Sequence, residues 1–156
     1  GWVSARQKMR FQALALQREH TVLEVGSGSG YGAAVLSRLA RRVYSIDRYR
    51  TLVDRARSTL DFLGVSSRVE FRLADGLAGW PEAAPFDRVL LMGAVPALPE
   101  EIGRQMAVGG VAVLPVERDG EGLILRLEKL ADGSFAETLV EKASFGPLQT
   151  GVAREL

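Results

Sequence analysis

The sequence predicts an α/β protein built on a mostly parallel sheet, and three observations lead to that prediction. Residues 21–47 give an apolar run, a glycine-rich turn, an amphipathic segment and a second apolar run that ends at Asp47. Apolar runs and helix-like segments then continue to alternate as far as residue 116. The last part of the chain holds β-rich runs that are separated by short turns. Alternating strands and helices favour a parallel sheet, whereas short turns favour antiparallel strands.

The elements of the first half follow from periodicity. Residues 5–17 carry apolar side chains at Met9, Ala13 and Leu16, which predicts a helix that packs on the sheet. A strand over residues 22–25 follows, then a helix over about 31–40 and a second strand over 42–47. The next helix is predicted over about 50–63, because Gly64 provides the usual glycine stop.

The second half begins with a strand over residues 69–73 and a turn-rich loop over 77–85. Residues 86–92 form an apolar run typical of a buried parallel strand. A short helix is predicted over 99–106, with Pro99 near its start and Gly109 and Gly110 ending that element. The fifth strand is predicted over 111–116. Two final strands, over 123–130 and 135–141, are joined by turns at 119–122 and 131–133 and should therefore be antiparallel.

The composition describes an ordinary globular domain. The 156 residues fit one domain, residues 1–156, with 47% hydrophobic and 25% charged side chains. The absence of cysteine excludes disulfides, thiolate zinc sites and a cysteine nucleophile. A single histidine, His20, argues against zinc, so we predict no metal. No apolar run has membrane-spanning length. We expect a cytoplasmic monomer with no membrane partner.

Charge is unevenly distributed along the chain. Residues 1–72 carry 13 basic and 6 acidic side chains, whereas residues 73–156 carry 7 basic and 13 acidic ones. The solvated faces of two helices and a loop account for the basic half. The more specific explanation of these basic residues is a nucleic-acid-binding surface, but no basic run is interleaved with aromatic residues. We therefore expect no nucleic-acid partner. The basic half includes Arg38, Arg41, Arg42, Arg48, Arg50, Arg55 and Arg57.

The glycine turn carries the clearest functional signal. Glycine adopts positive φ without steric cost and lets a ligand approach bare backbone. A dinucleotide fingerprint requires G-x-G-x-x-G, but here the third glycine comes one position early, at Gly30, and Tyr31 follows it. An acid at the end of the second strand, Asp47, can accept hydrogen bonds from both hydroxyls of a ribose. The turn, preceded two residues earlier by Glu24, resembles motif I of the class I S-adenosylmethionine (AdoMet) methyltransferases.

Longer segments resemble one family, the protein-L-isoaspartate O-methyltransferases. They are residues 22–47 (VLEVGSGSGYGAAVLSRLARRVYSID), 74–91 (ADGLAGWPEAAPFDRVLL), 106–116 (MAVGGVAVLPV) and 144–148 (SFGPL). The resemblance implies the Rossmann-like class I methyltransferase fold: a seven-stranded, mostly parallel sheet with one antiparallel strand and helices on both faces. It implies AdoMet as cofactor and S-adenosylhomocysteine as product. The implied cofactor-binding residues are Glu24, Gly26, Ser27, Gly28, Gly30, Tyr31, Asp47, Arg48, Asp75 and Gly76.

For some of these residues, a purely structural role is the alternative to cofactor binding. By resemblance, Asp47 binds the ribose, Asp75 and Gly76 contact the adenine, and Ser45 and Ile46 flank that pocket. Glu24 either orders the loop around the methionine end of the cofactor or caps backbone amides near the turn. Asp75 is alternatively a turn former before Gly76.

The acceptor side departs from the family pattern. Family members methylate the free α-carboxylate of L-isoaspartyl residues in damaged proteins or peptides, after which the ester collapses to a succinimide. The family's N-terminal region is expected to be missing or shortened here, and Ser4 matches the serine of its I-S-Q-P segment as the candidate catalytic residue. Residues 92–96 replace a Thr-Ala-Ala stretch, and Phe145-Gly146-Pro147-Leu148 replaces F-V-P-L. The alternative is an AdoMet-binding domain with a lost or different acceptor, such as a small molecule or RNA.

Overall fold

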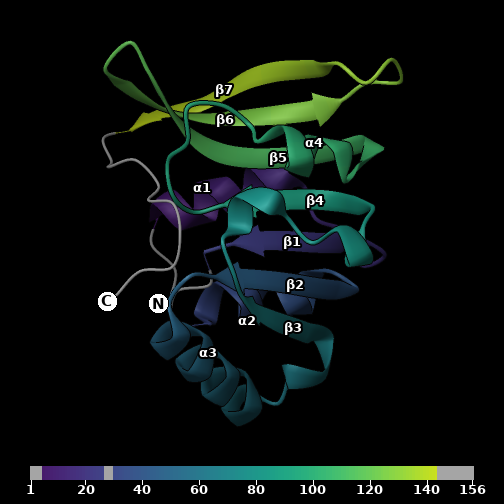
Figure 1. Cartoon of the computed structure of the whole chain (residues 1–156), viewed down its shortest axis with the longest axis vertical. Coiled ribbons are helices and arrows are strands. Elements are labelled where there is room, and N and C mark those ends of the chain that lie inside the picture. The colour runs from purple at the N-terminus through teal and green to yellow at the C-terminus, as the bar shows by residue number, and fades with distance from the viewer. Residues whose placement is uncertain (1–4, 27–29, 144–156) are drawn as a thin grey trace.

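A seven-stranded sheet forms the centre of the chain (Figure 1). The structure, a computed structural model, describes residues 5–26 and 30–143, so Ser4, Ser27, Gly28 and the segment 144–148 lie outside the described residues. The strands lie in the order β3-β2-β1-β4-β5-β6-β7. Their bounds are β1 Thr21–Val25, β2 Arg42–Asp47, β3 Val69–Leu73, β4 Phe86–Leu91, β5 Met106–Arg118, β6 Glu121–Lys129 and β7 Phe135–Ala143.

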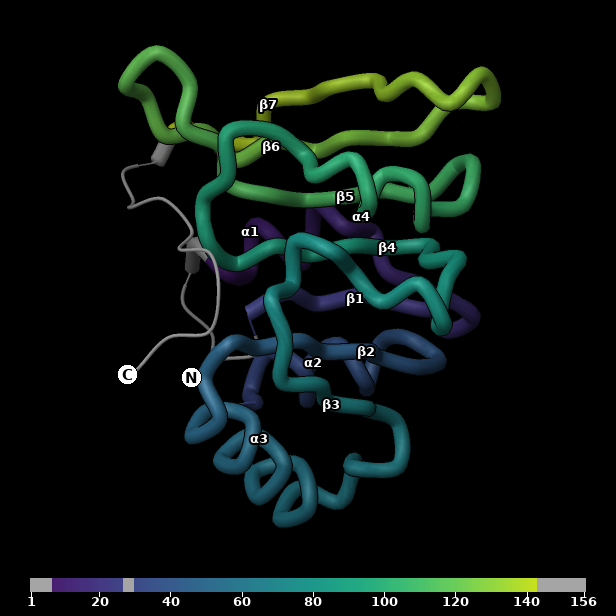
Figure 2. The backbone as a smooth tube through the Cα atoms, viewed as in Figure 1, coloured from purple at the N-terminus to yellow at the C-terminus, as the bar shows by residue number. Residues whose placement is uncertain are grey.

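One strand runs against the other six. β1 pairs in parallel with β2 and β4, β2 pairs in parallel with β3, and β4 pairs in parallel with β5. β6 is antiparallel to both β5 and β7. Figure 2 shows the two tight connections that join these last three strands. The prediction of a mostly parallel sheet with one antiparallel strand near an edge is confirmed.

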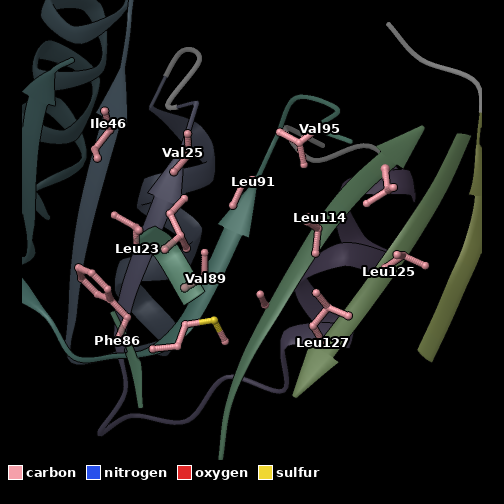
Figure 3. Close-up of a cluster of buried hydrophobic side chains, with 14 of the residues drawn as sticks. Leu23, Val25, Ile46, Phe86, Val89, Leu91, Val95, Leu114, Leu125 and Leu127 are labelled. Carbon is pink, nitrogen blue, oxygen red and sulfur yellow. The ribbon is translucent and has the colours of Figure 1, made fainter. Parts of the chain in front are cut away.

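Helices cover both faces of the sheet, but unequally (Figure 1). α1 (Ala5–Leu14), α2 (Tyr31–Leu39) and α3 (Arg50–Leu63) lie on one face, and the short α4 (Glu100–Arg104) lies on the other. The strands divide their side chains accordingly, because successive residues of a strand point to opposite faces. In β1, Val22 packs with α2, whereas Leu23 and Val25 enter the cluster on the α4 side, which Figure 3 shows.

Helix boundaries agree with the predicted ones where a glycine sets them. α3 ends at Gly64, whose φ of 74° allows its N–H to reach the carbonyl oxygens of Leu60 and Asp61. α1 stops at Leu14, three residues earlier than predicted, because Ala15 turns to a φ of 50°. The predicted loop over 77–85 contains short 3-10 turns at Gly76–Ala78 and Pro81–Ala83.

The predicted boundary between the fourth helix and the fifth strand was wrong. α4 spans Glu100–Arg104, and β5 already begins at Met106. Gly109 and Gly110 lie inside this strand, where its register against β4 shifts: Phe86 pairs with Met106, but Arg88 pairs with Val111. The glycines therefore accommodate a bulge, because Gly109 has a φ of 81° that other residues rarely adopt. In the part of the chain that the structure describes, no helix is both long and apolar enough to cross a bilayer.

Candidate functional site

The predicted site residues gather at the carboxyl ends of the central parallel strands. Val25 at the end of β1 pairs with Ile46 in β2 and with Leu91 in β4. Asp47 at the end of β2 pairs with Leu73 at the end of β3. The four strands therefore end at one edge of the sheet, the left-hand edge in Figure 1. Ligands of open α/β sheets bind at this edge.

Backbone hydrogen bonds hold the loops that leave this edge. The Gly26 N–H donates to the Ile46 carbonyl at 2.7 Å, and the Met92 N–H donates to the Val25 carbonyl at 3.0 Å. The Ala74 N–H donates to the Asp47 carbonyl, also at 3.0 Å. Each loop is thus anchored to the neighbouring strand, which gives the edge a defined shape.

The glycines of the turn are required by the protein's own packing. Gly26 and Gly30 have φ values of 98° and 92°, which strain any residue with a Cβ atom. A Cβ at Gly30 would lie 2.8 Å from the Cα of Ala56 in α3, and one at Gly26 would lie 3.0 Å from the Cβ of Met92. Gly26 and Gly30 can therefore keep these positions only because they lack a side chain.

Gly76 brings the loop after β3 against the end of β1. A Cβ at Gly76 would lie 2.3 Å from Cγ1 of Val25. Glycine lets this backbone pass next to the first strand, although β2 lies between β1 and β3 in the sheet. The loop that carries Asp75 and Gly76 therefore shares the edge with the glycine turn.

Glu24 is a buried acid beneath the first turn of α2. Its side chain is 1% exposed, and the Ser45 hydroxyl donates to its Oε1 at 2.7 Å. The pKa of Glu24 is raised to about 8, mainly by burial and less by the charge of Asp47, while the Ser45 hydrogen bond opposes the rise. A Cβ at Gly32 would lie 2.9 Å from Oε2. Glu24 is therefore largely protonated at neutral pH and packs closely under the helix.

The roles of two residues in this cluster were missed in the sequence. Ser45 was expected only to flank the pocket, whereas it is the hydrogen-bond partner of Glu24. Gly32 was not singled out, although its missing side chain makes room for the Glu24 carboxyl. The pairing of Glu24 with Ser45 across β1 and β2 is visible only once the register is known.

Asp47 stands where an acid was expected, at the end of β2. Its side chain is 5% exposed, and its Oδ1 accepts the Tyr49 N–H at 2.9 Å. This bond fixes the carboxyl group where the chain turns into α3. A carboxylate has about four lone-pair positions, so it can accept further donors such as the two hydroxyls of a ribose. Arg48, the next residue, is half-buried.

The other predicted contacts are more exposed. Asp75 is exposed, and its Oδ1 accepts the Leu77 N–H at 3.1 Å, which caps the short 3-10 turn. The turn-forming role is therefore present, and the adenine contact stays a prediction. Tyr31 begins α2 and is 38% exposed.

Contacts within the fold account for two further residues, Trp80 and Asp87. Trp80 is buried edge-on against Tyr44 with 5.2 Å between ring centroids, and the Arg72 guanidinium lies 4.1 Å above its ring. Asp87 accepts the Thr21 N–H at 2.9 Å, which joins the start of β4 to the start of β1. This contact gives Asp87 a structural role in the sheet. Among the described residues, no group of His, Asp and Glu side chains is arranged to hold a metal ion.

The architecture and the site define a class I AdoMet-dependent methyltransferase fold. A Plasmodium falciparum protein described as a possible protein-L-isoaspartate O-methyltransferase, solved with S-adenosylhomocysteine, superposes with a TM-score of 0.70 at 18% identity, over 95% of this chain and 71% of its own. The profile of the protein-L-isoaspartate(D-aspartate) O-methyltransferase family matches residues 4–153, and the chain belongs to this family. The family resemblance found in the sequence is thereby confirmed.

Individual relatives agree with this membership. A protein-L-isoaspartate O-methyltransferase of Maricaulis maris is 46% identical over 145 residues, which cover 93% of this chain and 67% of the relative. A solved structure named protein-L-isoaspartate O-methyltransferase superposes with a TM-score of 0.85 at 25% identity, over 96% of this chain and 49% of that one. The chain spans about 61–67% of the length of the curated relatives it matches.

Proposed function

We propose that this chain binds AdoMet at the carboxyl-end edge of the sheet and transfers its methyl group to the free carboxylate of L-isoaspartyl residues in damaged proteins or peptides. The observation that carries the proposal is the gathering of the glycine turn, Asp47 and Asp75-Gly76 at one edge, in a chain of this family. The Plasmodium falciparum neighbour was solved with S-adenosylhomocysteine, the product that this reaction leaves.

The residues at the edge suit the parts of AdoMet. The buried carboxylate of Asp47 would hold the ribose hydroxyls, with Arg48 beside it. Asp75 and Gly76 would contact the adenine, since their loop lies against the end of β1. The turn from Gly26 to Gly30, with Ser27 and Gly28, would approach the methionine part, and Tyr31 begins the helix behind it.

Glu24 would support this turn from below. Its carboxyl group lies under the first turn of α2 and is fixed by Ser45. An AdoMet molecule carries a sulfonium cation, which would favour the ionised form of a nearby acid. The raised pKa of Glu24 therefore places a titratable group where cofactor binding can change its protonation.

Methyl transfer to a carboxylate requires little from catalytic side chains. A carboxylate oxygen forms the new bond to the methyl carbon while the carbon–sulfur bond breaks and its electron pair remains on sulfur. The acceptor is ionised at neutral pH, since peptide carboxyl groups ordinarily have a pKa of about 4, so no general base is needed. The protein's task is to align the two reactants and exclude water. Ser4 would orient the acceptor by donating a hydrogen bond.

Initial rates on two matched peptides test the proposal. One peptide contains an L-isoaspartyl residue and the other contains aspartyl at the same position, and transfer of a labelled methyl group is followed for both. We expect transfer to the isoaspartyl peptide and none to the aspartyl peptide. Equal rates would show that the site does not recognise the isopeptide backbone, and a different acceptor would have to be sought.

Three finer expectations belong to the same proposal. We expect the chain to act as a single monomeric domain, in the cytoplasm, without a nucleic-acid partner. Size-exclusion chromatography with light scattering checks the monomer directly. Labelled transfer to bulk RNA, measured beside the peptide assay, checks one of the two alternative acceptors.

A further inference from the structure

Four arginines line a pocket at the opposite edge of the sheet. The pocket has a volume of about 360 Å³ and is lined by Arg18, Arg38, Arg41, Arg68 and Ala40. Arg18 precedes β1, Arg41 precedes β2 and Arg68 precedes β3, while Arg38 and Ala40 belong to the end of α2. The pocket therefore lies at the amino ends of the strands, the right-hand edge in Figure 1, away from the proposed cofactor site.

Within the lining of this arginine pocket, no acidic side chain balances the positive charge. None of its lining residues is acidic, and none of the four arginines forms an ion pair within the described parts of the chain. The C-terminus of α2 offers some compensation, because a helix end carries about half a negative charge. Half a charge leaves most of four positive charges uncompensated.

Two of the arginines are held in place by neutral partners. The Arg68 Nη1 donates to the Ser37 carbonyl at 3.2 Å, and the Arg41 Nη2 donates to the Thr21 hydroxyl at 3.4 Å. A guanidinium has five N–H donors, so each of these contacts occupies one donor and leaves others for a ligand. Anchored guanidinium groups lose less freedom when they bind, which favours recognition of an anion.

We propose that the arginine pocket binds a phosphate group of a small multivalent anion. Arginine matches phosphate oxygens in a bidentate manner, and several converging guanidinium groups favour an anion with more than one negative charge. The group belongs either to a soluble phosphate compound or to a lipid headgroup. Its binding would be independent of cofactor binding, because the two sites lie at opposite edges.

Calorimetry with pyrophosphate tests the soluble form of the anion. The variant is Arg18→Gln/Arg38→Gln, which removes two charges from the pocket and none of its anchoring hydrogen bonds. The control is Arg55→Gln/Arg104→Gln, which removes the same charge from exposed positions outside the pocket. We expect affinity to fall at least tenfold in the variant, since charged hydrogen bonds are lost. The control should retain the affinity of the wild-type protein.

A second experiment, with lipid vesicles, distinguishes a soluble phosphate compound from a lipid headgroup. Vesicles with phosphatidic acid are compared with vesicles of neutral lipid, for the wild-type protein and both double variants. Binding of pyrophosphate assigns a soluble anion, and pocket-dependent binding to phosphatidic acid alone assigns a lipid headgroup. Binding of neither ligand, or equal binding by both double variants, overturns the proposal.

One control separates this test from the proposed methyl transfer, and a second control tests for nucleic-acid binding. Heat from S-adenosylhomocysteine should be the same in the wild-type protein and in Arg18→Gln/Arg38→Gln. A duplex oligonucleotide that binds when pyrophosphate does not would also overturn the proposal, because it would show a surface for a nucleic-acid backbone and no pocket for a phosphate group.

Discussion

The two edges of the parallel sheet carry opposite chemistry. The carboxyl-end edge holds the acids Glu24, Asp47 and Asp75, two of them buried. The amino-end edge holds the four exposed arginines of the arginine pocket. Each acid accepts a hydrogen bond from the protein, whereas only Arg41 and Arg68 of the four arginines are anchored by one within the described residues. The three acids and the four pocket arginines therefore lie at opposite ends of the same strands, which the sequence shows only as an excess of basic residues in one half.

The largest loss of stability should come from adding a side chain in the glycine turn. Gly30→Ala adds a Cβ that would lie 2.8 Å from the Ala56 backbone, at a φ of 92°. Overpacking and positive φ together should lower the free energy of unfolding by about 2–4 kcal/mol. The control is Gly64→Ala, at a φ of 74° with nothing within 4 Å, which should cost about 1 kcal/mol. Denaturant unfolding measures both, and equal losses would show that the turn is not tightly packed.

The buried Glu24 should make stability depend on pH. Its pKa is raised from 4.5 to about 8 in the folded protein, so the folded state binds the proton more tightly than the unfolded state. The resulting stability is fully present below pH 4.5 and is lost as the pH rises through 8. Between about pH 5 and 8, the wild-type protein should lose about 3 kcal/mol relative to Glu24→Gln.

Glutamine keeps the volume of Glu24 and an oxygen that can accept from Ser45, so this variant isolates the charge. Denaturant unfolding at several pH values gives the difference between the two proteins. A difference that does not change over this pH range would mean that the Glu24 carboxyl is ionised throughout, despite its burial. The measurement is made without cofactor, because a bound cation would favour ionisation.

Asp47→Asn should weaken binding of S-adenosylhomocysteine. Asparagine keeps an oxygen that can accept the Tyr49 N–H, so the start of α3 is preserved while the charge is removed. Hydrogen bonds to charged groups contribute about 1.5–3 kcal/mol, so affinity should fall at least about tenfold. Calorimetry measures this change. The matched control is Asp54→Asn on the exposed side of α3, and a similar loss there would point to a nonspecific charge effect.

The smallest effect is expected at Asp75. Asp75→Ala removes the side-chain oxygen that accepts the Leu77 N–H, which should cost about 0.5–1 kcal/mol of stability. Asp75→Asn keeps an acceptor at the same position and should be nearly neutral. If Asp75 also contacts the adenine, Asp75→Asn should still lose affinity for S-adenosylhomocysteine in the calorimeter. Unchanged affinity would leave Asp75 with its turn-forming role alone.

The sequence was most informative where one local signal decides the structure. Gly64 ended α3 as predicted, and Gly26, Gly30 and Asp47 lie at the same edge of the sheet, as expected from the strand–turn–helix–strand pattern. It was least informative where tertiary pairing decides. Gly109 and Gly110 resemble a helix stop, but they accommodate a register shift that exists only because β5 pairs with β4. Ser45 becomes the partner of Glu24 only through the register of β1 and β2.

The arginine pocket is another feature that the sequence alone could not predict. Its arginines are spread between residues 18 and 68, and only the folded sheet brings them to one edge. The protonation of Glu24 likewise depends on complete burial, which no spacing rule predicts. Motifs therefore predicted which residues meet at the carboxyl-end edge, whereas the electrostatics of both edges became apparent only in the structure.

A crystal structure with S-adenosylhomocysteine and pyrophosphate tests the contrast between the two edges most directly. We expect the nucleoside at the carboxyl-end edge, with a ribose hydroxyl about 2.5–3.0 Å from the Asp47 carboxylate. We expect the phosphate among Arg18, Arg38, Arg41 and Arg68 at the other edge. A nucleoside bound away from Asp47, or pyrophosphate bound at the glycine turn instead of among the arginines, would contradict this division of the two sites.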